Sequence, residues 1–220
     1  MAKLKEREEA LRRRQQGESY SQIKKILGVS KGTLSIWLRN YPLSKERIRE
    51  LRDWNEQRIE RFRATMRGKR EERLETIYSA QKKYLLPLST RELLLSGLCL
   101  HWGEGSKSQT NSIILSNTDP GMIRFYICWL TQALCVPKEK IKIRLQLYRD
   151  MTAKKEIEYW ATILNIPQAQ FTTPYFKESL QKRINHKGSF GHGTCNVIAY
   201  NTKLAEVVAM SIKVIHNSVK

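Results

Sequence analysis

Residues 93–105 read Leu-Leu-Leu-Ser-Gly-Leu-Cys-Leu-His-Trp-Gly-Glu-Gly, an apolar segment that ends in an acid flanked by two glycines. Glu104 is the only acidic residue between Glu92 and Asp119, in a chain whose formal net charge is +19. A lone carboxylate in so basic a chain has one obvious chemical use, which is to hold a divalent metal ion beside a phosphate. Glu104 is therefore the first candidate for a reactive group.

The composition of the chain favours an anionic partner. The chain has 40 lysines and arginines but only 21 acidic residues, and the sequence pI is about 10.0. Nucleic acid is the commonest partner of such a surface, whereas a solvated basic surface or association with a ribosome is the alternative. Because 40% of the 220 residues are hydrophobic, the chain can bury a core in one large domain or two small ones.

Neither a membrane nor an oxidising compartment is indicated. The longest apolar run is far shorter than the ~20 residues that span a bilayer, and the N-terminus lacks the apolar core of a signal peptide. Four cysteines, at positions 99, 128, 135 and 195, show no Cys-x-x-Cys spacing. We expect buried thiols in a cytoplasmic protein.

Three zones follow one another along the chain. Residues 1–42 predict short amphipathic helices, and residues 43–87 predict a charged helical linker with Gly68 as its only breaker before Pro87. Residues 88–220 mix strand and helix patterns and hold most of the β-branched residues. The expected fold class is α+β, with a helix-turn-helix bundle, a long helical linker and a larger C-terminal domain.

The first zone has the pattern of a helix-turn-helix. Helices are predicted over residues 4–16, 22–27 and 31–40, with Ser21 and Ser30 as N-caps and Gly28 in the tight turn. Small and basic residues at the start of the third helix suit entry into the major groove. The predicted DNA contacts are Lys31, Gly32, Ser35 and Arg39.

Residues 10–40 resemble the helix-turn-helix of resolvases and of many regulators, with helix, Gly-x-Ser turn and second helix in register. The alternative is a three-helix fold without a DNA contact. For the linker we favour a spacer with incidental phosphate contacts. The alternatives there are a coiled-coil dimer with irregular heptads or a basic helix that crosses phosphates through Arg61, Arg63, Arg67, Lys69 and Arg70.

The C-terminal zone begins with a helix over residues 91–102, capped by Thr90. Ser96, Cys99 and Gly103 share one narrow stripe of that helix, and small residues there would let a second helix approach closely. Leu94, Leu95 and Leu98 are expected to face the core. Further strands are predicted at 112–118, 140–148, 170–176 and 194–200, and further helices at 122–134, 152–164 and 202–215.

The strand at 140–148 alternates strictly between apolar and polar residues. Its polar face carries Lys142, Arg144, Gln146 and Tyr148, which is the set that base and phosphate contacts require, and a solvated sheet face is the alternative. Residues 177–193 predict a basic loop that orders on DNA through Lys182, Arg183 and Lys187. A metal site at His186, His192 and Cys195 is the weaker interpretation of that region.

Residues 90–216 resemble the LAGLIDADG homing endonucleases. Cys99 and Gly103 fall where that family has small contact residues, Leu100 matches a family leucine by type, Glu104 falls on the metal-binding acid and Gly105 on the final glycine. The resemblance implies an αββαββα saddle and a two-fold pair of helices. His101, Trp102 and the additional helix at 152–164 depart from the family pattern.

The resemblance implies a Mg²⁺-dependent endonuclease that cuts double-stranded DNA. With one Gly-Glu-Gly helix in the chain, it implies a homodimer joined through Ser96, Cys99, Leu100 and Gly103, with metal at Glu104 and Gly105. Lys107, or else Lys203, would polarise the attack. The alternatives are a non-catalytic transcriptional regulator built on the same saddle and an RNA-binding or intron-splicing helper.

Overall fold

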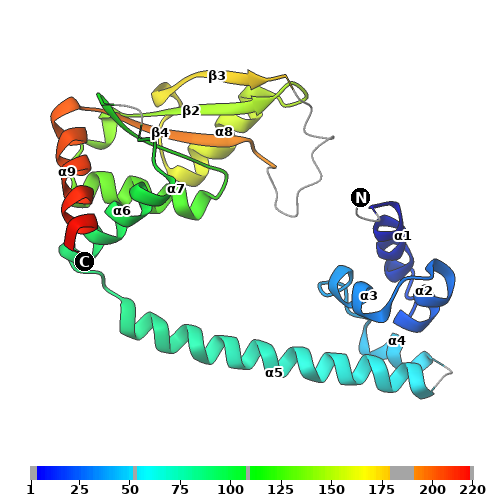
Figure 1. Cartoon of the computed structure of the whole chain (residues 1–220). Coiled ribbons are helices and arrows are strands. Elements are labelled where there is room, and N and C mark those ends of the chain that lie inside the picture. Colours follow the sequence, from blue (N-terminus) through cyan, green and yellow to red (C-terminus); the bar gives the residue numbers. More distant parts are fainter. Residues whose placement is uncertain (1–3, 52–53, 108–109, 179–190, 219–220) are drawn as a thin grey trace. The chain divides into compact units, whose positions relative to one another are not determined.

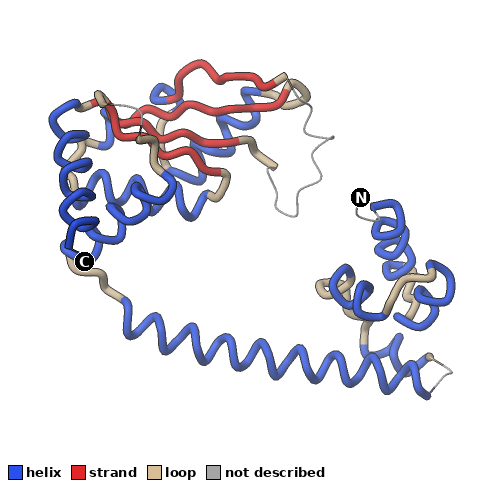
Figure 2. The backbone as a smooth tube through the Cα atoms, viewed as in Figure 1, coloured by secondary structure: helices blue, strands red, loops and turns tan. Residues whose placement is uncertain are grey.

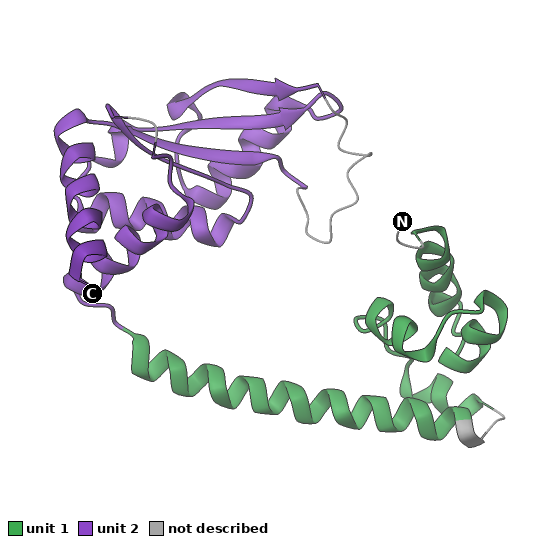
Figure 3. Ribbon diagram, viewed as in Figure 1, with its two compact units in different colours: residues 1–86 green, residues 87–220 purple. Residues whose placement is uncertain are grey.

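The computed structural model describes residues 4–51, 54–107, 110–178 and 191–218. The chain divides into two compact units, residues 1–86 and residues 87–220 (Figure 3). Each unit has its own hydrophobic core. The first unit holds the helix-turn-helix region and also nearly all of the residues predicted as a linker. Among the described helices, none combines the length and apolarity needed to cross a membrane.

The first unit is helical in its described residues. Its elements are α1 (Leu4–Gln15), α2 (Tyr20–Leu27), α3 (Lys31–Trp37), α4 (Lys45–Glu50) and α5 (Trp54–Leu85). Gly28 ends α2 with a φ of 63°, which a residue without a Cβ adopts freely, and the Ser30 hydroxyl accepts from Thr33 N at the start of α3. A small core holds the three N-terminal helices together, made of Ala10, Tyr20, Ile23, Val29, Leu34 and Leu38.

Two details of this region differ from the prediction. The N-cap of α2 is Ser19, not Ser21, because Gln22 stands three residues after Ser19 and closes a capping box with it. Helix α3 ends at Trp37 instead of Asn40, since Leu38 adopts a φ of −102° as its C-cap. Leu34 and Leu38 are buried as expected, whereas Trp37 is half-buried.

A buried ion pair attaches α5 to α1. The Arg14 guanidinium donates to both carboxylate oxygens of Glu60, over 3.1 and 2.9 Å, and the two side chains are 2% and 4% exposed. Tyr20 N also donates to Glu60, and Arg14 donates to the carbonyl oxygen of Tyr41. The start of α5 is therefore part of the helical bundle, and the spacer interpretation is wrong for this stretch.

The second unit contains four described strands and four α-helices. They are α6 (Thr90–Glu104), β1 (Ser112–Asn117), α7 (Pro120–Cys128), β2 (Ile141–Tyr148), α8 (Ala153–Leu164), β3 (Phe171–Lys177), β4 (Thr194–Tyr200) and α9 (Thr202–Ser218). A π-helical turn, Trp129–Ala133, continues α7. The strands form one mixed sheet in the order β1-β4-β2-β3, in which only β2 and β3 are parallel.

The sheet is covered on one face. Helices α6, α7 and α8 lie on the same side of it, and α9 packs near β1 (Figures 1 and 2). The core between these layers holds the inward residues of the strands together with Trp129 and Trp160, which have no exposed surface. No described helix covers the opposite face, which we call the open face of the sheet.

The order of elements corrects the expected saddle. The second unit reads αβαβαββα, not αββαββα, because α7 separates β1 from β2 and α8 separates β2 from β3. A parallel pair such as β2 and β3 cannot be closed by a hairpin and needs a crossover, which α8 provides. The α+β class and each predicted strand and helix of this unit are confirmed, but a LAGLIDADG saddle is not.

Local packing corrects three further expectations. The N-cap of α6 is Ser89, not Thr90, since Glu92 completes a capping box with Ser89. Leu95 is 41% exposed, whereas Leu98 is buried and Leu94 packs against the core. The cysteines are not all buried: Cys195 is buried, Cys128 is half-buried, and Cys99 and Cys135 are exposed.

Candidate nucleic-acid interface

The first surface of interest is the outer side of α3. Gly32 and Arg39 are exposed, Lys31 and Ser35 are half-buried, and Ile36 is 63% exposed. Arg39 lies just beyond the end of the helix. The four predicted contact residues therefore border one accessible strip of α3. Gly32 lies on its exposed side, and Lys31, Ser35 and Arg39 lie on its side toward α5.

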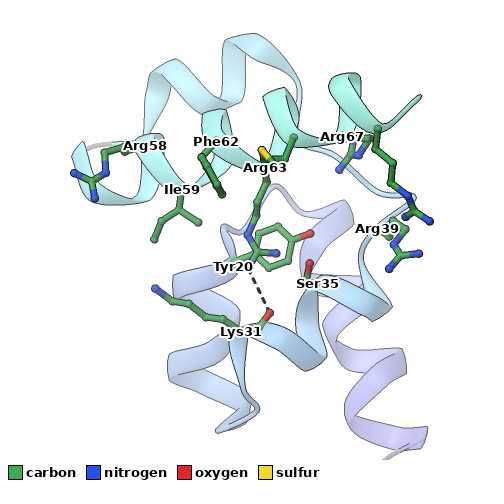
Figure 4. A pocket seen from close by; sticks show the side chains of 11 residues that line it. Tyr20, Lys31, Ser35, Arg39, Arg58, Ile59, Phe62, Arg63 and Arg67 are labelled. Atoms are coloured by element: carbon green, nitrogen blue, oxygen red, sulfur yellow. Dashed lines mark hydrogen bonds between the residues drawn. The ribbon is translucent and has the colours of Figure 1, made fainter. Parts of the chain in front are cut away.

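A groove runs between α3 and α5, and the sequence did not predict it. Its volume is about 920 Å³. Tyr20 and Phe62 contribute to an apolar wall, together with Ile59 and Met66, while six cationic side chains line the rest (Figure 4). The cations are Lys31, Arg39, Arg58, Arg63, Arg67 and Arg70. None of the eleven described residues that line the groove is acidic.

Arg63 lies at the centre of the groove (Figure 4). Its guanidinium lies 4.0 Å from the centroid of the Tyr20 ring, and its Nη2 donates to the carbonyl oxygen of Lys31 over 3.4 Å (Figure 4). Its Nη1 is buried and has no hydrogen-bond partner among the described residues. Neighbouring atoms cover Nη1, and the guanidinium as a whole adds a positive charge to the lining of the groove.

The open face of the sheet is the second surface. Cross-strand register aligns Ser116, Asn196, Arg144 and Thr172 in one row from β1 to β3. Neighbouring rows place Thr194, Gln146 and Tyr175 on one side, and Ile114, Ile198 and Lys142 on the other. No acidic residue stands in these rows. Arg144 is exposed, Lys142 and Gln146 are half-buried, and Tyr175 is 53% exposed.

Asn196 organises the middle of this face. Its side-chain oxygen accepts from Gln146 over 3.2 Å and from the Ser116 hydroxyl, and its amide donates to the carbonyl oxygen of Arg144 over 2.6 Å. Tyr148 differs from the other predicted contacts because it is only 6% exposed, with Lys177 Nζ 5.3 Å from its ring centroid. Strand alternation placed Tyr148 on this face but could not show that other side chains cover it.

Glu104 lies beside this sheet. It is the last residue of α6, it is exposed, and the next residue, Gly105, forms an antiparallel bridge with Leu115 of β1. Ser106 N donates to Ile114 O over 2.9 Å and continues the bridge. Lys107, three residues after Glu104, is also exposed. The structure thus places the candidate acid at the β1 edge of the sheet.

A buried aromatic cluster explains Gly105 without a metal. The His101 Nδ1 lies 2.7 Å from the Tyr126 hydroxyl, and a Cβ on Gly105 would lie 2.2 Å from the same nitrogen. Burial lowers the pKa of His101, and the charge of Lys107 lowers it further; burial also raises the pKa of Tyr126. Gly105 is therefore required by close packing on a neutral imidazole.

The predicted dimer stripe on α6 is accessible in the single subunit. Ser96, Cys99 and Gly103 are exposed, and a Cβ added to Gly103 would meet nothing within 4 Å. Leu100 differs, because it is half-buried and packs against the subunit's own core. The glycine of α6 that permits close packing inside the subunit is Gly97, where a Cβ would lie 2.1 Å from Trp129.

The remaining candidates contribute less. The described residues contain no group of three or more histidine, cysteine or acidic side chains placed to hold a metal. His192 instead pairs with Glu156 at 2.7 Å and stacks on Tyr159. Lys182, Arg183, Lys187 and His186 lie outside the described residues.

Comparison with known proteins supports the first surface. Residues 1–52 match the family model for a homeodomain-like domain, a helix-turn-helix fold that indicates DNA binding. The match confirms the predicted helix-turn-helix and describes it as homeodomain-like. No match to a LAGLIDADG or other endonuclease family was found. No curated protein and no solved structure matches the chain.

Proposed function

We propose that the protein binds specific double-stranded DNA through the helix-turn-helix of its first unit. The observation that carries this proposal is the accessible strip of α3, presented by a homeodomain-like fold and lined by cations. A helix of this kind fits the major groove and reads base edges there. The second unit would add contacts to the DNA sugar–phosphate backbone through the open face of its sheet. That face carries Arg144 and Lys142, and its aligned rows contain no acid.

Selection from a random duplex library tests this directly. The selected duplex should bind the full chain at least a thousandfold more tightly than an unrelated duplex, about the ratio seen for specific readers. Arg39→Ala should weaken the selected duplex more than the unrelated one. Duplex RNA of the same sequence serves as competitor, and equal affinity for RNA would favour an RNA-binding role.

We further propose that two copies of the chain cut the bound duplex with Mg²⁺. Three features support this: the exposed acid at the sheet edge, the accessible stripe of Ser96, Cys99 and Gly103, and the oxygen donors at Glu104 and Gly105. Oxygen ligands suit Mg²⁺, which one or two carboxylates usually hold together with waters and phosphates, and a pair of subunits would supply two Glu104 carboxylates.

The protein's own groups would have separate tasks in that reaction. Glu104 of each subunit and the Gly105 carbonyl would hold Mg²⁺, which when bound activates water and stabilises the leaving oxygen. Arg144 and Lys142 would hold the duplex, and Lys107 would place a positive charge beside the attacked phosphate. Incubation of the selected duplex with Mg²⁺ should give cleavage that EDTA abolishes.

Glu104→Gln is the decisive variant for cleavage, because it keeps the size of the side chain and removes its charge. It should bind the selected duplex like the wild type and leave it intact. Cleavage at the wild-type rate by this variant would show that Glu104 is not the metal ligand.

A non-catalytic regulator is the second candidate function, and one observation favours it. Gly105 is explained by its contact with His101, so the Gly-Glu-Gly segment does not need a metal to account for its final glycine. If the wild type binds the selected duplex as a dimer and never cuts it with Mg²⁺ or Mn²⁺, the regulator is the better account.

A further inference from the structure

We infer that the groove between α3 and α5 holds one sugar–phosphate strand of the duplex that α3 reads. On this view the first half of α5 is a DNA-binding element and not a spacer. The inference rests on the proposed duplex binding by α3, and it assigns a second set of contacts that the helix-turn-helix alone does not provide.

The dimensions of an α-helix and of B-DNA lead to this inference. A helix with its side chains is about 10–12 Å across, and the major groove is about 12 Å wide. A helix that lies in the groove therefore has a phosphate backbone on each flank. Lys31, Ser35 and Arg39 form the flank of α3 that faces α5 (Figure 4). Side chains on the opposite side of the groove from this flank would therefore contact the phosphates of one DNA strand.

The charge of α5 decides whether the interaction between α5 and this DNA strand is attractive. Arg58, Arg63, Arg67 and Arg70 line the side of the groove opposite α3, and no acid lines it among the described residues. Arg58 lies toward one end of the groove, whereas Arg67 lies toward the other end, near Arg39 (Figure 4). The cations thus follow the length of the groove, as successive phosphates of one strand would require.

The groove is also held in place before DNA arrives. The Arg14–Glu60 pair fixes the start of α5 to α1, and the Ser19 hydroxyl donates to Glu56 over 2.8 Å. Arg63 lies on the Tyr20 ring with Nη1 unsatisfied among the described residues. The Arg63 guanidinium places a positive charge beside the groove, and the apolar wall of Ile59, Phe62 and Met66 suits deoxyribose carbons.

The salt dependence of binding provides the test. Each phosphate contact contributes about 0.9 to the slope of log affinity against log salt concentration. Arg67→Gln with Arg70→Gln should lower that slope by about 1.8. Between 50 and 200 mM salt the wild type should then lose about 12-fold more affinity for the selected duplex than the double variant does.

Lys82→Gln with Lys83→Gln is the matched control. It removes the same charge from exposed positions of the same helix, outside the groove. At 1.5 Å per residue these positions lie at least about 18 Å from Arg70, which exceeds the Debye length of about 14 Å at 50 mM salt and all shorter values at higher salt. The control should keep the wild-type slope. Equal slopes for the two variants would overturn the inference.

Three other results would also test the inference that the groove holds a DNA strand. If the groove variant changes single-stranded but not duplex binding, the groove holds a different ligand and the inference fails. If Arg67→Gln with Arg70→Gln disturbs the fold by circular dichroism, Arg58→Gln at the other end of the groove replaces it and should lower the slope by about 0.9. If the wild type binds no duplex at all, the proposed function fails first, which separates the two failures.

Discussion

Loss of the buried Arg14–Glu60 ion pair should greatly lower the free energy of unfolding of the first unit. Glu60→Gln keeps the shape of the side chain but leaves the Arg14 guanidinium, whose side chain is 2% exposed, without a counter-charge. Breaking a buried pair from one side costs about 3–5 kcal/mol. Because Arg14 keeps its bonds to the carbonyl oxygens of Tyr41 and Glu18, we expect the lower end, about 3 kcal/mol.

The effect should be confined to one unit. For a unit of 86 residues, about 3 kcal/mol corresponds to a fall in Tm of about 12–24 °C. Hydrogen–deuterium exchange with urea should show early exposure of amides in α1, α2 and the start of α5, while the sheet of the second unit keeps its protection. Glu71→Gln, an exposed acid on the same helix, is the control and should change stability by less than about 0.5 kcal/mol. Equal behaviour of the two variants would refute the role given to the pair.

Four shorter predictions concern the second unit and the turn. Gly97→Ala should destabilise the second unit by about 1–3 kcal/mol in urea unfolding, because its Cβ would lie 2.1 Å from Trp129. Gly103→Ala should leave that stability unchanged or raised by up to about 1 kcal/mol, yet weaken the proposed dimer in sedimentation; an unaffected dimer argues against the α6 stripe. Since the folded pKa of His101 lies below its ordinary 6.5, the unfolded state binds more protons near that pH. The second unit should therefore lose stability as the pH falls from about 6.5, and a His101→Gln variant with the same pH profile would exclude His101 as the cause. Ser30→Ala should cost about 1 kcal/mol of first-unit stability by loss of the α3 N-cap, and no change in urea midpoint would contradict the cap.

The local elements could be predicted from the sequence because their signals are local. Gly28 and Ser30 fixed the turn before α3, and the alternation at residues 140–148 marked β2 and its two faces. The two misplaced caps had a readable signal as well. Gln22 and Glu92 each stand three residues after the true cap, and this spacing selects Ser19 over Ser21 and Ser89 over Thr90.

The contacts between distant segments could not be predicted in the same way. Arg14 and Glu60 are 46 residues apart, and nothing near either residue indicates the other. The α3–α5 groove also brings together residues far apart in the sequence, so local patterns do not predict it. Its residues Arg63, Arg67 and Arg70 enter only the alternative of a basic helix that crosses phosphates. The central position of β4 in the sheet, and the cover over Tyr148, depend on pairing and packing that periodicity does not encode.

The most direct test of duplex reading by α3 is a single charge placed on its exposed side. At Gly32 an added Cβ would meet only the Ser30 hydroxyl oxygen, at 3.7 Å, so Gly32→Glu is compatible with the fold. Fluorescence anisotropy with the selected duplex should show at least a tenfold loss of affinity, which is about 1.4 kcal/mol. Ala80→Glu, with the same charge change at an exposed position of α5, should bind like the wild type. Wild-type affinity in Gly32→Glu would contradict the account, because a carboxylate cannot enter the major groove without repulsion from the phosphates on both sides.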